Sequence, residues 1–486
     1  MLLSELINGD GGPAGKIEIR GLTADSRAVR PGYLFAALRG SRADGSDFVA
    51  DAVAHGAIAV LAAEGARIEL PEDKVRLVTD ANPRRRLALM AARFHPAQPR
   101  VIAAVTGTNG KTSVAAFARQ IWERMGVPAA SLGTLGIVGR DVSRSLSHTT
   151  PDPVTLHQAL SDLAAADIDH LAIEASSHGL DQCRLDGVRV SAAAFTNLTQ
   201  DHLDYHPSAE AYLAAKLRLF DTVMAPGGVA VLNADAPEFA RLAEVCRARG
   251  HRIMSYGRTA GDLRLVGAGA VDDGQRLTID VAGRRRTVAL PLPGAFQAMN
   301  ALCAAGLVVA CGVAIDDALA ALSGIAGVPG RVECVARHPC GAPVYVDYAH
   351  TPDALAHVLE ALRPHARGRL VVVFGCGGDR DRTKRPLMGK IAAALADHAI
   401  VTDDNPRGED PGAIRRAVLA ACPGADEVDD RARAIREAIA RLAPGDVLVI
   451  AGKGHERGQI VGQTVIPFDD AEIARAAVAG LRGDDR

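Results

Sequence analysis

"VIAAVTGTNGKTS" (residues 101–113) decides the fold of this chain. An apolar run typical of a buried strand leads into a short loop, and apolar residues at helical spacing begin directly after that loop. Gly107 and Gly110 allow backbone N–H groups to turn inward, and Lys111 can reach phosphates. The hydroxyl of Thr112 can hold Mg²⁺. The common phosphate-loop pattern has glycine where this chain has Val105, so an ordinary strand-to-helix turn is the alternative interpretation.

The residues after the loop predict an amphipathic helix that ends near Gly126 and Pro128. Its apolar positions fall on one face, which we expect to lie in the core. These positions are Val114, Phe117, Ala118, Ile121, Trp122 and Met125.

Two joints rich in Pro and Gly, at 94–100 and 324–331, divide the chain into pieces 1–98, 99–328 and 329–486. Apolar runs followed by polar loops recur in the second and third pieces, at 170–179, 192–206, 229–237, 344–353, 369–381 and 446–456. Strands of this kind, separated by helical stretches, are typical of parallel sheets covered on both faces. The sequence predicts an α/β protein of three domains: an N-terminal domain, a central P-loop ATPase-type parallel sheet and a C-terminal Rossmann-like domain. Alternation in 262–290 predicts a small antiparallel insert.

Composition limits the function. The 486 residues carry a net charge of −2, and aromatic residues make up only 3 %. Neither value favours nucleic acid or an anionic membrane as a partner. The eight cysteines form no C-x-x-C pair, which favours buried thiols in a reducing cytosol. We see no signal peptide and no apolar run near the ~20 residues of a membrane span, so we expect a cytoplasmic protein.

Seven motifs occur in order along the chain: "GTNGKT" (107–112), "NLTQDHLDYH" (197–206), "GRVE" (330–333), "DYAHTPDAL" (347–355), "GCGGDRD" (375–381), "DDNPR" (403–407) and "GKGHE" (452–456). With them the chain resembles the Mur ligases of peptidoglycan synthesis over essentially its whole length. The resemblance implies a monomeric, ATP-dependent amide ligase that activates a carboxylate as an acyl phosphate. The substrates implied are ATP, a UDP-N-acetylmuramoyl-dipeptide ending in D-glutamate, and meso-diaminopimelate.

The resemblance also implies a nucleotide and metal site. Mg²⁺ would be held by Thr112, Glu174, His202 and Lys216, the last as a carbamate formed with CO₂, although from its residues alone a helical lysine is expected at the surface. Catalytic roles fall to Lys111, Glu174, His202 and Lys216. The residues assigned to ATP are Gly107, Thr108, Asn109, Gly110, Lys111, Thr112, Ser113, Asn300, Arg331 and Asp347. Because Arg331 and Asp347 belong to the third piece, that domain must close on the second.

The UDP-sugar acceptor is expected to span the first two domains. In the family's uridine-binding stretches the matching residues are Ala24, Ser26, Ser41, Arg42 and Ala43. On the central domain they are His148, Thr149, Thr150, Ser176, Gln182 and Arg184. His148 departs from some relatives, which have Asn at this place. Short polar loops of this kind are otherwise ordinary turns.

"TDDNPRGED" (402–410) raises the question of specificity. Relatives that add meso-diaminopimelate carry D-N-P-R, as this chain does. A fixed guanidinium can pair with the extra carboxylate that distinguishes diaminopimelate from L-lysine. The residues assigned to this ligand are Arg380, Asp404, Asn405, Pro406, Arg407, Gly452 and Glu456. The alternative is that Arg407 only pairs with Asp403 or Glu409 across the turn.

Three other functions stay open from the sequence. The chain could add L-lysine, which D-N-P-R opposes. It could be a ligase like folylpolyglutamate synthase, although that enzyme lacks the uridine-binding first domain. It could be a non-catalytic nucleotide-dependent scaffold, although a scaffold needs no complete set of metal-binding residues.

Overall fold

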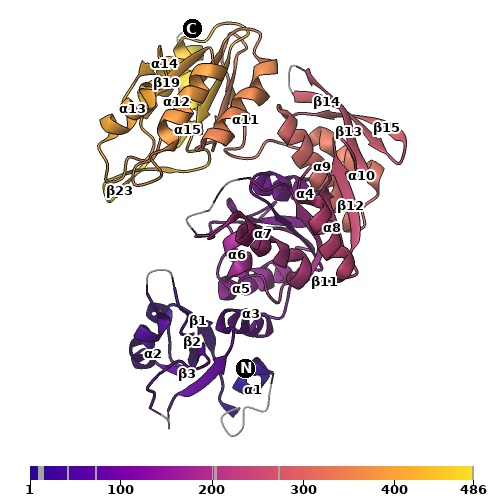
Figure 1. Ribbon diagram of the computed structural model, residues 1–486, viewed down its shortest axis with the longest axis vertical. Helices are drawn as coiled ribbons and strands as arrows, with labels where there is room; N and C mark the ends of the chain where they lie inside the picture. The colour runs from indigo at the N-terminus through magenta and orange to yellow at the C-terminus, as the bar shows by residue number, and fades with distance from the viewer. Residues whose placement is uncertain are drawn as a thin grey trace. The chain divides into compact units, whose positions relative to one another are not determined.

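The computed structural model describes residues 1–8, 16–40, 43–71, 74–199, 201, 205–271 and 274–483. These residues divide into two compact units. Their helices and strands are labelled in Figure 1. Unit 1 comprises Met1–Leu263 and Cys303–Ala318, and unit 2 comprises Arg264–Leu302 and Leu319–Arg486. Ser41, Arg42 and His202, which the sequence assigned to binding roles, lie outside the described residues.

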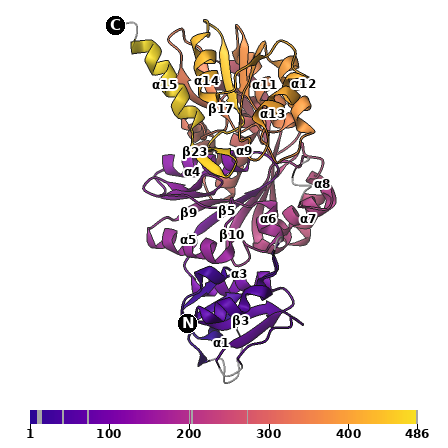
Figure 2. The same ribbon diagram turned by 90° about the vertical axis from the view of Figure 1, so that its left-hand side faces the viewer.

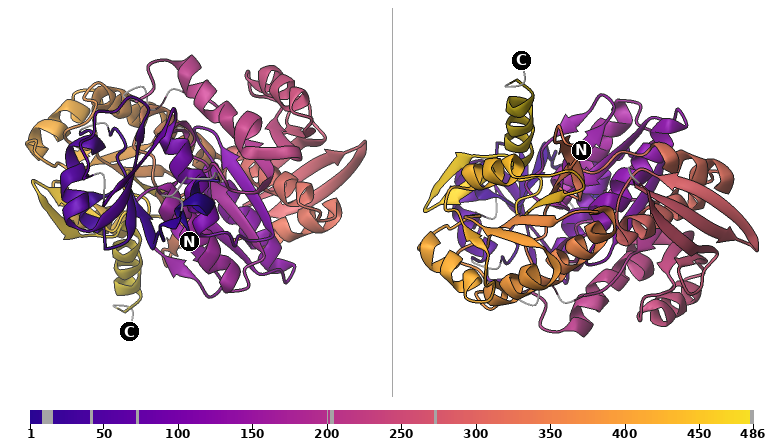
Figure 3. Two further views of the ribbon diagram at one scale, coloured as in Figure 1. Left: turned by 90° about the horizontal axis from the view of Figure 1, so that it is seen from below. Right: turned by 90° about the horizontal axis from the view of Figure 1, so that it is seen from above.

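A small parallel sheet in the order β1-β2-β3-β4 opens unit 1 and is coloured indigo in Figure 3. One face packs against helices α1 and α3 around Leu6 and Met90, and the other packs against α2 around Val49. The elements are α1 (Leu3–Ile7), β1 (Gly21–Thr23), β2 (Tyr33–Ala36), α2 (Val49–Ala54), β3 (Ala57–Ala63), β4 (Arg76–Asp80) and α3 (Pro83–Phe94).

A larger sheet follows, and the strands of it that belong to unit 1 run in the order β12-β11-β10-β5-β9-β6-β7-β8. Strands β12 to β6 pair in parallel, and β7 and β8 add an antiparallel edge. The strands are β5 (Val101–Thr106), β6 (Ala129–Gly133), β7 (Gly136–Gly139), β8 (Ser143–Arg144), β9 (His170–Glu174), β10 (Val190–Phe195), β11 (Met224–Asn233) and β12 (Arg252–Gly257). Figure 2 shows β9, β5 and β10 side by side. Their carboxyl ends lie at one edge, where ligands bind in such sheets.

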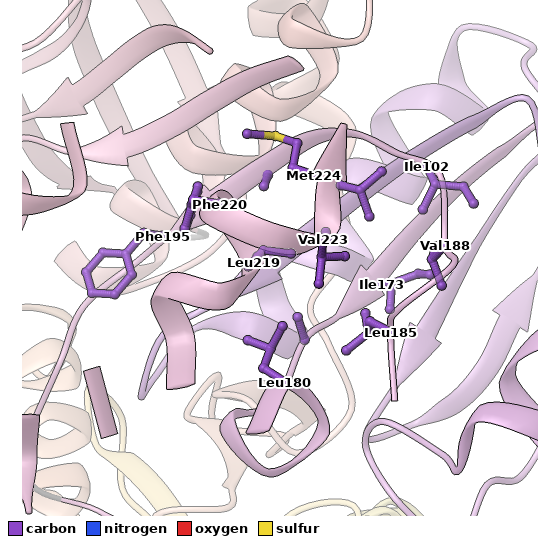
Figure 4. Packing of buried hydrophobic residues seen from close by; sticks show 14 of the residues in the cluster. Ile102, Ile173, Leu180, Leu185, Val188, Phe195, Leu219, Phe220, Val223 and Met224 are labelled. Carbon is purple, nitrogen blue, oxygen red and sulfur yellow. The ribbon is translucent and has the colours of Figure 1, made fainter. Parts of the chain in front are cut away.

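Helices cover this sheet, and its central strands are therefore buried along almost their whole length. Figure 4 shows the packing on one face, where Ile102, Ile173 and Phe195 meet the helical residues Leu219 and Phe220. The helices of this region are α4 (Lys111–Arg124), α5 (Pro153–Ala165), α6 (Ser177–Asp181), α7 (Ala209–Arg218) and α8 (Phe239–Ala248).

Unit 2 begins with β13 (Leu263–Val271), β14 (Gly274–Val281) and β15 (Arg284–Leu290), of which β14 and β15 form an antiparallel pair. Helices α9 (Ala295–Ala310) and α10 (Ile315–Ala321) each contribute residues to both units. The expected antiparallel insert at 262–290 is confirmed.

The second sheet of unit 2 runs in the order β16-β17-β21-β18-β19-β20, all parallel except the edge strand β16. Helices pack on both faces around two cores, and the right panel of Figure 3 shows them in orange and yellow. The elements are β16 (Glu333–Arg337), β17 (Pro343–Asp347), α11 (Pro352–Leu362), β18 (Leu370–Phe374), α12 (Lys384–Leu395), β19 (His398–Val401), α13 (Pro411–Leu419), β20 (Asp426–Glu427), α14 (Arg431–Ala440), β21 (Val447–Ala451), β22 (Gly458–Val461), β23 (Thr464–Pro467) and α15 (Asp470–Gly483).

Four helices begin in the same way, with a polar cap followed by proline. The cap side chain accepts a hydrogen bond from a backbone N–H of the first turn, and proline at the first helical position sacrifices no hydrogen bond. The pairs are Asn82–Pro83, Asp152–Pro153, Thr351–Pro352 and Asp410–Pro411. These local signals place helix starts close to the polar loops.

The α/β fold with three domains is confirmed, while the exact domain boundaries stay a prediction. One expectation about the core was wrong. Met125 is 38 % exposed, because α4 ends at Arg124 and Met125 is its C-cap residue. The other apolar residues predicted for this helix are buried.

Candidate active site

The loop between β5 and α4 lies at the carboxyl edge of the central sheet. The residues after β10 hold it there: Asn197 accepts a hydrogen bond from Asn109 N at its side-chain Oδ1 (2.9 Å) and one from Thr108 N at its backbone carbonyl (2.8 Å). Gly107 must be glycine because a Cβ would collide with the Thr196 hydroxyl. Gly110 has φ +89° and caps α4. The loop thus aims a helix N-terminus at its ligand, as a phosphate site requires.

A carboxylate and a hydroxyl meet beside this loop. Thr112 Oγ1 donates a hydrogen bond to Glu174 Oε2 (3.0 Å), and Glu174 is only 2 % exposed. The backbone N–H of Thr134 donates to the other oxygen, Oε1 (2.8 Å). Gly133 leaves room for this carboxylate, since a Cβ there would collide with it. Hard oxygen ligands of this kind suit Mg²⁺.

Clusters of three or more His, Cys, Asp or Glu side chains able to hold a metal are absent from the described ranges. Of the four residues predicted to hold Mg²⁺, the described ranges contain Thr112, Glu174 and Lys216.

Lys216 is buried in α7, with 1 % exposure, and its Nζ donates a hydrogen bond to the Gly107 carbonyl (2.8 Å). The ammonium also lies 4.2 Å from the centre of the Tyr212 ring. Burial lowers the pKa of Lys216 well below its ordinary value, the positive charge of Lys111 lowers it further, and Asp201 opposes the shift. This environment favours a neutral amine, which is the form that reacts with CO₂.

The residues predicted to meet the acceptor on the central domain form one connected group. Thr150 Oγ1 donates to the Glu174 carbonyl (2.8 Å), and Ser176 N donates to Thr150 Oγ1 (3.1 Å). Arg184 donates to the Thr150 carbonyl through Nη1 (2.6 Å) and to Gln182 Oε1 through Nη2 (2.8 Å). This group is therefore tied to the main chain of Glu174, the residue whose carboxylate lies beside the phosphate loop.

Two further residues of this set lie close to the group. Thr149 Oγ1 lies 3.1 Å from Thr134 Oγ1, and the same Thr134 hydroxyl donates a hydrogen bond to Glu174 Oε2 (3.1 Å). His148 is exposed and contacts Ser147 through its ring.

The first domain presents its predicted uridine residues after β1 and β2. Because these strands pair in parallel, the residues that follow them lie at the same edge. Ala24 and Ala43 are exposed, and Ser26 is partly buried. The domain contacts the central part of unit 1 through Arg85, whose Nε lies 3.0 Å from Asp186 Oδ2.

Unit 2 brings together the other residues predicted to bind ATP. Asp347 at the end of β17 accepts hydrogen bonds from Val332 N and Ala349 N, each 2.7 Å long. Burial raises the pKa of Asp347 to about 6, and the charge of Arg331 opposes the shift. The Arg331 guanidinium lies 4.8 Å from the centre of the Tyr348 ring.

Asn300 reaches the same group through Gln297. Its Nδ2 donates to Gln297 Oε1 (3.2 Å), and Gln297 Nε2 donates to the Arg331 carbonyl (3.0 Å). Gln297 is fully buried, so it fixes both partners.

The D-N-P-R loop follows β19 and carries Arg407 in the left-handed region, at φ +51°. Its Nη1 donates to the carbonyl of Gly378 (2.9 Å) and contacts that of Asn405 (3.5 Å). Within the part of the chain that the structure describes, no carboxylate lies within ion-pair distance of this guanidinium.

The alternative partners of Arg407 are taken. Asp403 pairs with Arg415, and Glu409 pairs with Arg385 Nη2 (2.9 Å). The guanidinium is thus held by carbonyls, with its charge available for a ligand.

Of the other residues predicted for diaminopimelate, Gly452 and Glu456 lie against the same loop, whereas Arg380 makes no contact with it among the described residues. Asp404 is 6 % exposed and lies against Gly452, where a Cβ would come within 2.8 Å of its Oδ2. Burial raises the pKa of Asp404, while Arg431 and Lys453 oppose the shift. Arg380 is exposed, and the D-N-P-R residues are not among the groups that it contacts in the described ranges.

Other residues of the group connect it to its surroundings. Pro406 is buried and continues the loop between Asn405 and Arg407. Asp379, next to Arg380, accepts a hydrogen bond from Gly408 N (2.9 Å). Asn405 Nδ2 donates to Glu456 Oε2 (3.0 Å).

Sequence reasoning missed several residues that build these groups. Lys453 was part of a quoted motif without a role, and Gly133 and Thr134 support Glu174 from a hairpin without a motif. Arg431, fully buried against Asp470, carries no local signal in the sequence.

Comparison with known proteins places the chain in a family. Three family models match it: the "Mur ligase family, catalytic domain" at residues 18–95, the "Mur ligase middle domain" at 105–308 and the "Mur ligase, glutamate ligase domain" at 330–454. The chain belongs to the Mur ligase family.

Similar proteins carry a more specific name. A protein of Bradyrhizobium diazoefficiens, named UDP-N-acetylmuramoyl-L-alanyl-D-glutamate–2,6-diaminopimelate ligase, is 54 % identical over 489 residues and covers 99 % of both chains. A protein of Caulobacter vibrioides with the same name is 53 % identical over 469 residues, covering 95 % of this chain and 96 % of its own.

A similar solved structure carries the same name as these relatives. The structure of a UDP-N-acetylmuramoyl-L-alanyl-D-glutamate–2,6-diaminopimelate ligase covers 99 % of both chains, at 31 % identity and a TM-score of 0.75. A search of the described helices for one long and apolar enough to cross a membrane finds none.

Proposed function

We propose that this chain is an ATP-dependent amide ligase of peptidoglycan precursor synthesis. It adds meso-2,6-diaminopimelate to the D-glutamate carboxylate of UDP-N-acetylmuramoyl-L-alanyl-D-glutamate. The names and the 54 % and 53 % identities of its relatives support the reaction. The observation that carries the choice of amino acid is Arg407, a fixed guanidinium that contacts only carbonyl oxygens among the described residues.

The phosphate loop serves ATP in this proposal. The loop from Gly107 to Ser113 holds the phosphates through the backbone N–H groups that Asn197 does not occupy, and Lys111 neutralises their charge. Mg²⁺, when bound, would screen the phosphates from the incoming carboxylate. The Thr112 hydroxyl and the Glu174 carboxylate, 3.0 Å apart, fit such an ion, and His202 completes the set by family resemblance.

As a carbamate, Lys216 would supply a further anionic ligand for Mg²⁺. Its buried amine attacks CO₂ to form a C–N bond, and loss of one proton leaves a carbamate. A negative carbamate suits a site beside Lys111, because the Lys111 ammonium attracts it, whereas the same ammonium would repel a protonated Lys216. The residues around Lys216 therefore favour the modified form.

The reaction itself proceeds in two steps. An oxygen of the D-glutamate carboxylate attacks the γ-phosphorus of ATP, and ADP leaves with the electron pair of the broken P–O bond. The amine of diaminopimelate then attacks the acyl carbon, and phosphate leaves with the oxygen that came from the carboxylate. By family resemblance, Asn300, Arg331 and Asp347 also bind ATP, and the Asp404 carboxylate accepts a hydrogen bond from the ammonium group of the amino acid.

The binding of the acceptor completes the proposal. The uridine part lies against the first domain at Ala24, Ser26, Ser41, Arg42 and Ala43, and the peptide part lies against the group from His148 to Arg184. We also propose that the protein works in the cytoplasm, where its small soluble substrates are found, and that it is a monomer, as the family resemblance implies.

The test is phosphate release from ATP with the UDP-linked dipeptide, comparing meso-diaminopimelate with L-lysine. Release that requires both the dipeptide and diaminopimelate is expected. A preference for L-lysine would contradict the role of Arg407 but keep a ligase. Release with a folate and glutamate instead would favour a folylpolyglutamate synthase, and no turnover with any pair would favour a scaffold.

A further inference from the structure

The side chain of Asn405 is almost fully occupied by the protein itself. Its Oδ1 accepts hydrogen bonds from Lys453 Nζ (2.9 Å) and from Ile460 N (3.0 Å). Its Nδ2 donates to Glu456 Oε2 (3.0 Å). Because an amide offers two lone pairs and two N–H groups, one N–H is left for a ligand. The Asn405 side chain therefore mainly connects Lys453, Ile460 and Glu456 in one hydrogen-bond network.

Lys453 is the cation of this network. It follows β21 and Gly452 directly, and its side chain is 0 % exposed. Besides Asn405, its Nζ contacts Glu456 Oε2 (3.3 Å) and lies 3.9 Å from Asp404 Oδ1. One buried ammonium thus touches three side chains that the family assigns to the amino acid.

The other buried cation of this region cannot replace it. Arg431 donates to both oxygens of Asp470, at 2.7 Å each, and to the Ala451 carbonyl at 3.0 Å. These hydrogen bonds hold the Arg431 guanidinium, which belongs to α14, against the start of α15 and the end of β21. Lys453 is left as the cation that contacts Asn405 and Glu456.

Strand β22 fixes the loop from another side. Arg407 N donates to the Ile460 carbonyl (3.0 Å), and Gly462 N donates to the Arg407 carbonyl (2.8 Å). Gln459 Nε2 donates to the Asp404 carbonyl (2.8 Å). These bonds stabilise the left-handed backbone of Arg407, which a residue with a Cβ adopts only with support.

We propose that Lys453 is a positioning residue that makes the site selective for diaminopimelate. It holds the Asn405 amide and the Glu456 carboxylate in place, and through Asn405 it fixes the loop that presents Arg407. This inference rests on the proposed function. Without Lys453, Oδ1 of Asn405 loses a charged donor, and the carboxylates of Asp404 and Glu456 lose a neighbouring positive charge.

The first test is Lys453→Met, which keeps the length of the side chain and removes the ammonium. Loss of a charged hydrogen bond predicts a rise of roughly 10- to 100-fold in KM for diaminopimelate. The KM values for ATP and for the UDP-linked dipeptide should stay within about twofold of the wild type, since uniform binding of these substrates is untouched. A purely structural role would not separate the three constants.

Arg369→Met is the matched control. Arg369 precedes β18 at the opposite end of the same sheet and pairs with Asp446 (2.7 Å). The Arg369→Met variant should have lower thermal stability without a selective rise in KM for diaminopimelate. The inference is overturned if Lys453→Met leaves that KM unchanged, or if it raises all three constants alike.

A double-mutant cycle tests the route through Asn405. If Lys453 acts through that amide, the double variant Lys453→Met, Asn405→Leu has a KM for diaminopimelate no higher than that of the more damaging single variant. Additive effects would contradict the route. Lys453→Gln keeps a donor for Asn405 without the charge, so it supplies a second variant if methionine prevents folding. It should show a smaller selective rise, and KM values equal to the wild type would overturn the proposal.

Assays of the wild-type enzyme distinguish a failure of the role of Lys453 from a failure of the proposed function. Wild-type turnover that depends on diaminopimelate, combined with unchanged variants, refutes the role of Lys453 alone. Absence of such turnover in the wild type refutes the proposed function, and the positioning role with it.

Discussion

Arg407→Ala tests how this chain recognises its amino acid. The guanidinium is partly buried, is fixed by two carbonyl groups and has no carboxylate partner among the described residues. Removing one partner of a hydrogen-bonded charge pair costs about 2–5 kcal/mol. Because Arg407 keeps some contact with water, the lower part of this range applies. We expect about 2–3 kcal/mol, which is a rise of roughly 30- to 150-fold in KM for diaminopimelate.

The assay is steady-state phosphate release with each substrate varied in turn. The KM for ATP should change little, and discrimination between diaminopimelate and L-lysine should fall by a similar factor. Arg407→Lys should recover only part of the loss, since a lysine offers no planar pair of donors. Arg416→Ala is the control, because Arg416 is an exposed neighbour on α13 that pairs with Asp410. Equal losses toward ATP and diaminopimelate would refute the reasoning.

Three further predictions concern other parts of the site. Gly133→Ala should displace the Glu174 carboxylate and lower kcat by roughly 10- to 100-fold, as loss of support for a metal ligand does. Gly139→Ala in the same hairpin should leave kcat unchanged. Equal kcat values for the two variants would contradict this prediction. Lys216→Met should remove the carbamate signal that ¹³C NMR detects in the wild type with ¹³CO₂, and lower kcat by at least about 100-fold; a retained signal would place the carbamate elsewhere. The pKa of Asp347 is about 6 in the folded protein, against an ordinary value of 3.8. Between pH 4 and 6 this carboxyl group therefore binds more protons in the folded than in the unfolded state. Its contribution to the free energy of unfolding falls by about 3 kcal/mol as the pH rises through this range. Asp347→Asn should remove this fall in urea titrations, and parallel curves for both proteins would contradict it.

Much of the fold could be predicted because its signals are local. The solid apolar runs of β5, β9, β18 and β21 are buried along almost every residue, as the sequence indicated. Parallel strands end at one edge, so the polar loops after them had to converge. The antiparallel strands β14 and β15 were visible from their alternation.

Other features could not be predicted from local sequence. A lysine within a helix is ordinarily at the surface, yet Lys216 is 1 % exposed because its side chain reaches the phosphate loop more than a hundred positions earlier. Arg431 finds Asp470 on another helix. The left-handed backbone of Arg407 depends on β22, which follows it by about fifty residues. Each depends on contacts between distant segments.

The network around Asn405 shows the same limit. The family resemblance gave Asn405 a role toward the ligand, but three of its four hydrogen-bonding positions are filled by Lys453, Ile460 and Glu456. A motif marks which residues matter, while only the geometry separates those that touch a ligand from those that hold others in place.

The central claim is that the chain joins an amine to a carboxylate activated by ATP. The most direct measurement uses UDP-N-acetylmuramoyl-L-alanyl-D-glutamate with ¹⁸O in the D-glutamate carboxylate that forms the new bond, followed by mass spectrometry of the products. The account predicts a diaminopimelate-containing product and inorganic phosphate that carries one ¹⁸O from the carboxylate. Phosphate without the label would mean that water, and not the carboxylate, attacked ATP, and the absence of the ligated product would contradict the ligase itself.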